Sequence, residues 1–346
     1  AMDDLAAWTK EQEANTPSVL VAPLGEESGR DWIACSLEDG CIKDIIGHPR
    51  RNATHRFAAF AFPRSFLHYV RHNSGIFSNI QPGVMPPMEG YLEMSLVDYM
   101  NDGYSVPALE TQDVFLDLDK PWHILMANEL VVRKLCTDLD ENYLSPGASI
   151  HETAFIDGYV HLGKNSYIGR NVIIQGNVIV GDNTTIENGA ILVGNAVIGD
   201  HCYIGNYCYI EDNSAIGRGS VVSHAAEFGG VLMERIHLYH YMEVWGVVGS
   251  GTDIGAATVC GNLRFDDGET SHVIKGRREY PKRFANAVYI GDYCRTGVNA
   301  ILMPGCKVGV YSVVGPGVVL NEDVPNGTYV RVEQQLEKIP WGPERY

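Results

Sequence analysis

The sequence predicts a mainly β protein in which a parallel β-helix follows a small α/β domain. Three observations support this prediction. From Ile150 to Val222 every sixth residue is isoleucine, leucine or valine, thirteen times in succession. The residue that follows is small or polar at almost every step, and it is often glycine. A period of six matches neither the 3.6-residue period of a helix nor the two-residue period of a strand, so it indicates an internal structural repeat.

Three six-residue strands joined by tight corners make one coil of a triangular prism. The aliphatic residue points into the prism, and the small residue after it lets the backbone turn. Each coil buries its core only against its neighbours, so the element is extended in one direction and needs caps. The pattern resembles the hexapeptide-repeat proteins. This resemblance implies a left-handed parallel β-helix, an exception to the usual right-handed crossover.

The repeat is interrupted twice. The register is lost over residues 223–246 and has resumed at Ile254. A second break over residues 261–288 is an excursion, after which the count resumes in phase at Ile290 and continues to Leu320. Loops that interrupt a regular solenoid usually carry its function, so we expect the functional site near these breaks.

Segments with strand and helix patterns alternate in the first part of the chain, which predicts a small α/β unit. Helices are expected over residues 3–14, 63–72 and 92–100, extended segments over 18–24, 32–36, 42–46, 56–62 and 114–118, and a loop over 82–87. Residues 121–137 have helical spacing, with an apolar stripe at Ile124, Ala127, Val131 and Leu135. We divide the chain into the α/β domain (1–128), a helical connector (129–145), the β-helix (146–332) and a C-terminal tail (333–346).

The composition excludes several classes of function. A formal net charge of −17 argues against nucleic acid or an anionic membrane as the partner. The eight cysteines form no CxxC pair, and several occupy small-residue positions of the coils, so we expect reduced thiols and a cytoplasmic protein. No apolar run reaches the length of a membrane span, and we expect no signal peptide before the first strand.

The order of segments before the β-helix resembles the C-terminal half of a sugar-1-phosphate nucleotidylyltransferase domain. The resemblance rests on Gly47-His48-Pro49, on the strand at 57–62, on the helix at 92–101, and on the motifs at 115–122 and 127–129. That family begins with a Gly-rich nucleotide loop, but the nearest segment here, residues 25–30, is acidic, and the first half of the domain is missing. We therefore expect a truncated domain without nucleotidylyltransferase activity.

Residues 255–266, GAATVCGNLRFD, closely resemble a segment in the acetyltransferase half of the bifunctional sugar-1-phosphate nucleotidylyltransferase/acetyltransferases. These enzymes are similar to glucosamine-1-phosphate acetyltransferases, and the segment resembles the archaeal type in particular. Residues 289–305 continue the match. The resemblance covers about residues 30–332. It implies a homotrimer that binds acetyl-CoA between neighbouring prisms and needs no metal for acyl transfer. By family position, the backbone near Ala256, Val298 and Gly315 would line the pantetheine arm, with Arg331 near the nucleotide end.

Acyl transfer from a thioester to an amine needs a general base, because an ammonium must lose a proton before it can attack. The family places this base in a His-Leu-x-Tyr segment, and alignment with different gaps leaves His237 and His240 as candidates here. We favour His237 slightly, because Leu238 follows it. Tyr241 could contact the acceptor or simply pack, and both histidines could also belong to an ordinary exposed loop.

Asn262 matches a substrate-binding asparagine of the family without a gap, although it could also be an ordinary corner residue. Five basic residues lie close together in the second break: Lys275, Arg277, Arg278, Lys282 and Arg283. They either form a solvated face or attract the phosphates of CoA or of a phosphorylated acceptor, and we assign Lys275 to the cofactor. The phosphate-binding lysines of the family fall on Gly229, Gly268 and Ser271, which leaves recognition of a sugar 1-phosphate in doubt.

The sequence therefore favours an acetyl-CoA-dependent N-acyltransferase that acts on an amino sugar, a sugar phosphate or a related small amine, with a histidine as general base. The alternative is a catalytically silent trimeric homologue with a binding or scaffold role. A metal-dependent β-helix enzyme of the carbonic anhydrase type would need three converging histidines, and only His237 and His240 are close in sequence here.

Overall fold

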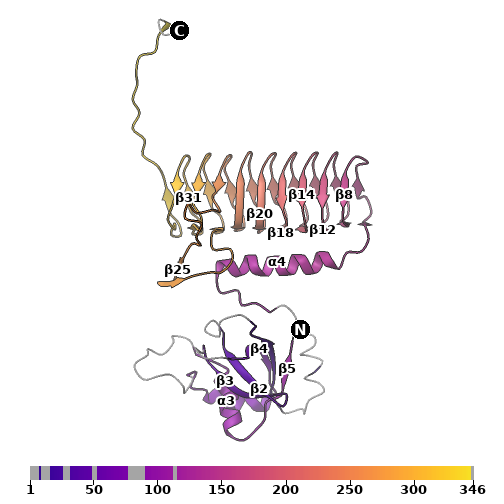
Figure 1. Cartoon of the computed structure of the whole chain (residues 1–346), viewed down its shortest axis with the longest axis vertical. Helices are drawn as coiled ribbons and strands as arrows, with labels where there is room; N and C mark the ends of the chain where they lie inside the picture. Colours follow the sequence, from indigo (N-terminus) through magenta and orange to yellow (C-terminus); the bar gives the residue numbers. More distant parts are fainter. Residues whose placement is uncertain are drawn as a thin grey trace. The chain divides into compact units, whose positions relative to one another are not determined.

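The structure is a computed structural model that describes residues 8, 16–25, 32–48, 53–76, 90–111 and 115–343. The chain divides into two compact units, residues 1–115 and 116–346, each of which is described by itself (Figure 1). The division lies earlier than the expected domain boundary at residue 128, because the helix that begins at Pro121 packs within the second unit.

The first unit is a five-stranded sheet with strand order β3-β2-β4-β1-β5. All its strand pairs are antiparallel except β1 with β5. Its elements are β1 (Ser18–Pro23), β2 (Ala34–Glu38), β3 (Cys41–Ile46), β4 (His55–Ala61), the 3-10 helix η2 (Arg64–Phe66), α2 (Leu67–His72), α3 (Met94–Asn101) and β5 (Ala108–Glu110). The helices α2 and α3 pack on each other, and Leu96 of α3 is completely buried.

One expectation for this unit is wrong. Residues 115–118 do not form a strand, and the fifth strand, β5, lies earlier, where it pairs in parallel with β1. Residues 115–118 form no ladder with a described strand, whereas β5 lies beside β1, and the backbone N–H of Thr111 directly after it donates to the oxygen of Val21. The helix expected over residues 3–14 is described only at Trp8, and the loop at 82–87 and most of the acidic segment at 25–30 lie outside the described residues.

The second unit is a parallel β-helix with three faces, as predicted. Face 1 is a ten-stranded sheet of β7 (Ser149–Ile150), β10 (Tyr167–Ile168), β13 (Thr185–Ile186), β16 (Tyr203–Ile204), β19 (Val221–Val222), β21 (His237–Leu238), β23 (Asp253–Ile254), β28 (Arg295–Thr296), β31 (Val313–Val314) and β33 (Tyr329–Val330). Face 2 holds β8 (Phe155–Asp157), β11 (Ile173–Gln175), β14 (Ile191–Val193), β17 (Tyr209–Glu211), β24 (Val259–Cys260), β29 (Ile301–Leu302) and β32 (Val319–Leu320). Face 3 holds β6 (Tyr143–Leu144), β9 (Val160–Leu162), β12 (Val178–Val180), β15 (Ala196–Ile198), β18 (Ser214–Ile216), β27 (Val288–Ile290) and β30 (Lys307–Val308).

Two longer strands, β20 (Glu227–Leu232) and β22 (Glu243–Val248), run from face 2 into face 3. We call the corner between faces 1 and 2 corner 1, and the corner between faces 2 and 3 corner 2. The period-six residues from Leu162 to Val222 are all buried inside the prism, whereas Ile150 and Ile156, in the first coil, are partly buried.

The first break in the sequence repeat is a shortening of two coils rather than an interruption. Val222 pairs with Leu238, and Leu238 pairs with Ile254, so these coils are 16 residues long instead of 18. Because β20 and β22 pass straight through corner 2, two residues of that corner are absent from each coil. The passage depends on Gly230 and Gly246, which have φ values of 115° and 147°. A Cβ on Gly230 would lie 2.2 Å from the oxygen of Gly246.

The second break is an excursion, as predicted. It leaves face 2 after β24, forms an antiparallel hairpin of β25 (His272–Ile274) and β26 (Arg277–Glu279), and returns to the prism at β27. The next rung, Ile254 opposite Thr296, is back in register.

The helix α4 (Pro121–Thr137) begins and ends at the residues that the sequence indicated, with Pro121 in its first turn. It runs along the prism and contacts β15, β18, β20 and β22 (Figure 1). The expected apolar stripe is wrong, since Val131 and Leu135 are 48% and 45% exposed. The buried side chains are those of Trp122, Leu125, Val132 and Cys136. Both stripes are apolar, and docking on the prism selects between them.

Hydrogen bonds from corner 2 fix the position of α4. Nδ2 of Asn177 donates to the backbone oxygen of Cys136 at 2.7 Å and to that of Leu139 at 3.3 Å, near the C-terminal end of the helix. Nδ2 of Asn128 donates to the oxygen of Asn213 at 2.6 Å. The two bonds from Asn177 reach carbonyl groups at and just beyond the C-terminal end of α4, where the intrahelical hydrogen bonds stop.

All eight cysteines lie in the described part of the chain, and none forms a disulfide. Five are buried in the prism, where burial raises the pKa of the Cys208 thiol to about 11. The cytoplasmic location inferred from them stays a prediction. None of the described helices has the length and apolar character of a membrane span.

We expect Val132→Ala to lower the free energy of unfolding by about 1.5–3 kcal/mol, because it removes two buried methyl groups and leaves a cavity under α4. Val131→Ala, one residue away on the exposed side, should change it by less than about 0.5 kcal/mol. Chemical denaturation of both variants measures the difference. Equal effects would mean that α4 buries both sides equally.

Candidate functional site

Three side chains of different chemistry form a row on the outside of face 1. His237 pairs in register with Asp253, and Asp253 pairs with Arg295. The next residue on each of these strands points into the prism, so the three side chains point outward. Nδ1 of His237 lies 3.2 Å from Oδ1 of Asp253, and Nε of Arg295 lies 3.1 Å from Oδ2. The carboxylate therefore lies between the imidazole and the guanidinium.

This row can orient a general base. A carboxylate beside Nδ1 favours the tautomer with the proton on Nδ1, which leaves the lone pair of Nε2 free to accept a proton. Nη1 of Arg295 donates to the backbone oxygens of Gly251 and Cys294, both at 2.9 Å, so the cation is held beside Asp253. The His237 side chain is 45% exposed and accessible to a substrate.

Corner 1 lies directly after this row and carries most of the other predicted residues. The backbone N–H of Ala257 donates to the oxygen of His240 at 2.9 Å, that of Asn299 to Ala256 at 3.0 Å, and that of Gly317 to Val298 at 3.0 Å. His240, Ala256 and Val298 therefore hold the same position in three successive coils.

Gly315 and Arg331 continue this edge toward the end of the prism. The N–H of Gly315 donates to the oxygen of Val330 at 2.8 Å, which places Arg331 one coil beyond Gly315 at the same corner. Arg331 is exposed, and its Nη2 lies 3.9 Å from Oε1 of Glu333. Ala256, Val298, Gly315 and Arg331 thus lie at corner 1 in four successive coils, with Gly315 and Arg331 one residue earlier in the corner than Ala256 and Val298.

His240 belongs to an aromatic cluster and not to the row on face 1. Its ring centroid lies 4.5 Å from that of His224, whose Nε2 lies 2.8 Å from the hydroxyl of Tyr241. Tyr241 is 65% exposed and has a φ of 53°. Within the described part of the chain, no carboxylate forms an ion pair with His240, so the geometry favours His237 as the oriented base. The same part holds no group of three His, Cys, Asp or Glu side chains arranged for a metal ion.

Asn262 and Lys275 are at the other side of the prism. Asn262 follows β24, where the chain leaves for the excursion at corner 2, and Lys275 occupies the hairpin turn with a φ of 48°. Within one chain the structure does not bring them to His237.

Three of the five basic residues of the excursion are engaged by neighbouring side chains. Arg283 pairs with Glu129 of α4, Nε of Arg277 lies 3.4 Å from Oε1 of Glu279, and Nη1 of Arg278 donates to the hydroxyl of Ser271 at 2.7 Å. The basic cluster is therefore partly neutralised by the protein, and Lys275 is one of its exposed members.

A buried histidine anchors the excursion on the prism. Nδ1 of His272 lies 3.0 Å from Nζ of Lys307, which also lies 2.7 Å from Oδ2 of Asp323. Because an ammonium can only donate, the imidazole proton is on Nε2, which lies 2.8 Å from the oxygen of Ala285. Its ring also contacts Trp122 of α4 at a centroid distance of 5.1 Å. Burial, and secondarily the Lys307 cation, lower the pKa of His272 below its usual 6.5.

Known proteins resemble this chain in sequence and in fold. A family model described as the GMPPB C-terminal domain matches residues 139–232. A protein of Sulfurisphaera tokodaii named bifunctional sugar-1-phosphate nucleotidylyltransferase/acetyltransferase is 28% identical over 262 residues, which are 75% of this chain and 59% of that protein. The bifunctional protein GlmU of Methanococcus vannielii is 32% identical over 126 residues, 36% of this chain and 30% of the relative. The resemblance inferred from the sequence is confirmed.

The match spans less than two thirds of the length of both curated relatives. Among solved structures, a UDP-N-acetylglucosamine acyltransferase from Campylobacter jejuni is similar, with a TM-score of 0.34 and 14% identity, over 52% of this chain and 68% of that chain.

The sequence analysis missed Asp253 and His224, and it gave Arg295 no role although Arg295 lies in a matched segment. These residues could have been found only from the length of the coil that separates them from their partners. His237 and Asp253 are one coil apart only if that coil has 16 residues, whereas the preceding repeat has 18. The same spacing relates His224 to His240.

Acidification should loosen the excursion. The lowered pKa of His272 means that the neutral imidazole is favoured in the folded chain. The docking of neutral His272 contributes fully to the stability of the excursion above pH 6.5. This contribution is lost as the pH falls from 6.5 toward the lowered pKa of the docked imidazole, because protonation of His272 then favours the undocked segment. Hydrogen exchange of residues 262–286 at pH 7.5 and 5.5, corrected for intrinsic rates, measures this loss.

His272→Gln is the matched control, since glutamine can donate to Ala285 and accept from Lys307 but does not titrate. In this variant we expect no extra exchange at pH 5.5. An equal response of both proteins to acid would assign the effect to a group other than His272.

Proposed function

We propose that this chain is an acetyl-CoA-dependent N-acyltransferase that acts on an amino sugar or a related small amine, with His237 as general base. The observation that carries the proposal is the position of Asp253 beside Nδ1 of His237 on an accessible face. The relative of Sulfurisphaera tokodaii, named a nucleotidylyltransferase/acetyltransferase, supports the same class of reaction.

In the proposed reaction, the lone pair of the neutral acceptor amine attacks the thioester carbonyl carbon, and the carbonyl electrons move to oxygen in a tetrahedral intermediate. Nε2 of His237 takes the proton that the nitrogen gives up as this bond forms. When the intermediate collapses, the carbon–sulfur bond breaks and His237 returns the proton to the departing CoA thiolate. The products are an amide and free CoA. Asp253 orients the ring and stabilises the imidazolium that forms.

The donor would lie along corner 1. Neighbouring coils are about 4.8 Å apart, so the line from Ala256 through Val298 and Gly315 to Arg331 spans about 14 Å. An extended pantetheine arm fits such a line better than a compact ligand does. Arg331 at its end, and Lys275 of a neighbouring copy, would meet the phosphates of CoA.

The acceptor is expected to lack a phosphate. The family position of a phosphate-binding lysine falls on Gly229, where a Cβ would lie 2.4 Å from Oε2 of Glu211 and 2.6 Å from Cδ1 of Trp245. A carboxylate there would repel a sugar phosphate and tolerate a neutral or cationic sugar.

We expect a homotrimer, because Asn262 at corner 2 and Lys275 in the hairpin turn of the excursion could complete the site only from a neighbouring prism. Face 2 has the apolar surface for such contacts: Phe155, Tyr209, Val259, Ile301 and Val319 are 36–61% exposed. Light scattering after size exclusion should give about three times the chain mass of 38.1 kDa. Tyr209→Glu should lower this mass, whereas a monomer in both proteins would contradict the assembly.

A thiol-release assay with acetyl-CoA and a panel of amino sugars and their phosphates tests the reaction. His237→Ala should lower kcat/KM by about 10²–10⁴, and His240→Ala by less than about tenfold. Asp253→Asn should lower kcat and change its pH profile while acetyl-CoA still binds. Binding without turnover would point to the wrong acceptor. No binding of any CoA thioester would contradict the enzyme and favour a silent scaffold trimer.

A further inference from the structure

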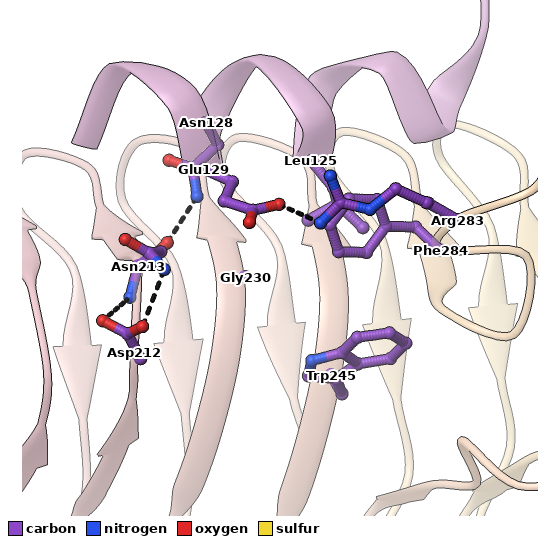
Figure 2. A pocket seen from close by; sticks show the side chains of 9 residues that line it. All are labelled: Leu125, Asn128, Glu129, Asp212, Asn213, Gly230, Trp245, Arg283 and Phe284. Carbon is purple, nitrogen blue, oxygen red and sulfur yellow. Dashed lines mark hydrogen bonds and ion pairs between the residues drawn. The ribbon is translucent and has the colours of Figure 1, made fainter. Parts of the chain in front are cut away.

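The second unit has a recess of about 200 Å³ beneath α4, but the charged side chains that line it already have partners within the chain (Figure 2). Glu129 and Arg283 form an ion pair with each other. Oδ1 of Asp212 accepts from the backbone N–H of Asn213 at 2.9 Å, and Oδ2 accepts from the amide of the same residue at 2.8 Å. A recess in the first unit differs in this respect.

The recess of the first unit is lined almost entirely by aromatic rings. It lies where η2 and α2 meet the C-terminal end of α3, and its volume is about 230 Å³. This is below the roughly 300–1,000 Å³ of sites for drug-sized ligands, so the recess suits a small head group. Its lining residues are Ser65, Phe66, Tyr69, Tyr99 and Tyr104. Ser65 and Tyr104 are exposed, so the recess is open to solvent.

The turn after α3 builds the first wall. Gly103 follows the helix with a φ of 90°, which residues with a Cβ rarely adopt. The backbone N–H of Tyr104 then donates to the oxygen of Tyr99 at 3.4 Å, across the end of the helix. The chain therefore folds back, and the two tyrosine rings stack with centroids 4.7 Å apart and planes inclined at 19°.

A second pair of stacked rings forms the other wall. The rings of Phe66 and Tyr69 are 5.4 Å apart between centroids and inclined at 26°. Phe66 is buried, which fixes this wall to the core of the unit. The ring of Tyr69 meets that of Tyr99 at 5.2 Å and 84°, and the ring of Phe66 meets it at 5.5 Å and 67°. The two walls therefore meet at a steep angle, and a group in the corner between them contacts ring faces on two sides.

Ring faces on two sides favour a cation. The face of an aromatic ring is its negative side, so it attracts a cation within about 6 Å of the ring centroid. An ammonium that carries methyl groups also buries apolar surface against the rings, which is why quaternary ammonium ions are bound by clusters of aromatic rings.

A carboxylate lies beside the recess. The hydroxyl of Tyr69 donates to Oδ2 of Asp102 at 2.8 Å, and Asp102 is exposed. This hydrogen bond, more than any other contact, raises the pKa of Tyr69 to about 12, so the phenol stays neutral and keeps donating. The charge of Asp102 attracts a cation to the recess and repels an anion. Arg64 and Arg71, the basic residues of η2 and α2, are not among the described residues that line it.

We propose that this recess binds a small quaternary ammonium ion, with its methyl groups against the two pairs of rings and its charge toward Asp102. The formal net charge of −17 also favours a cation over an anion. The site lies within the first unit, so it does not rest on the acyl transfer proposed for the second.

Saturation-transfer NMR titration of the full chain, measured on the methyl protons of choline, tests the proposal. The matched probe is 3,3-dimethyl-1-butanol, which has the shape of choline without its charge. We expect choline to bind at least about fivefold more tightly than this neutral alcohol, because only the cation is attracted by the ring faces and by Asp102. Phosphocholine should also bind more weakly than choline, because Asp102 repels its phosphate. Preference for phosphocholine would overturn the proposal and indicate a phospholipid head group.

Two variants test the residues that carry the proposal. Asp102→Asn keeps an acceptor for Tyr69 but removes the charge, and it should weaken choline binding about threefold or more. Its control is Asp39→Asn, which removes the same charge from the β2–β3 turn, where asparagine tolerates the φ of 50°. Tyr104→Ala removes an exposed ring and should weaken binding about fivefold or more, whereas Tyr280→Ala removes an exposed tyrosine of the second unit and should not.

Thermal melting checks that each variant is folded. Three further outcomes would overturn the proposal. The first is no saturation transfer to choline, and the second is equal binding of choline and the neutral alcohol, which would assign the recess to an apolar group. The third is unchanged choline binding by Asp102→Asn and Tyr104→Ala, which would place choline elsewhere on the chain.

Discussion

The stacking of each coil on the next is the constraint on which the rest of this structure depends. Parallel ladders place each residue over its counterpart in the preceding coil, so side chains outside the prism line up in rows. The row of His237, Asp253 and Arg295 and the line from His240 to Arg331 are both consequences of this stacking. The candidate site therefore needs no special loop to gather its residues, and its spacing is that of the backbone hydrogen bonds.

Departures from the repeat give this surface its particular chemistry. The two 16-residue coils set the register in which His237 meets Asp253, and they also remove the corner beneath α4. One change in coil length thus acts at two places on the prism. The excursion that follows fills the space beside the shortened coils, and the buried His272 holds it there through its contact with the partly buried Lys307.

The periodic features were predictable because each depends on a pattern that repeats. The aliphatic period predicted the prism, and the helical spacing predicted both ends of α4. The stripe that α4 buries was not predictable, since Val131 and Val132 are equally apolar and only the docking partner distinguishes them. Asp253 was not predictable, because its pairing with His237 depends on a coil length that no single residue indicates. His272 was not predictable either, because its partner, Lys307, lies far along the chain.

The position of α4 also bears on how the prism comes apart. A stack of coils that touch only their neighbours can be peeled from either end, one coil at a time, with little resistance from the rest. Here α4 is hydrogen-bonded to Asn177 of corner 2 near its C-terminal end, and it packs against His272 near its N-terminal end. The coils between these two points cannot separate until α4 detaches, so they should unfold together when the prism is pulled apart. The coils toward β33 are not spanned by α4 and can fray one at a time.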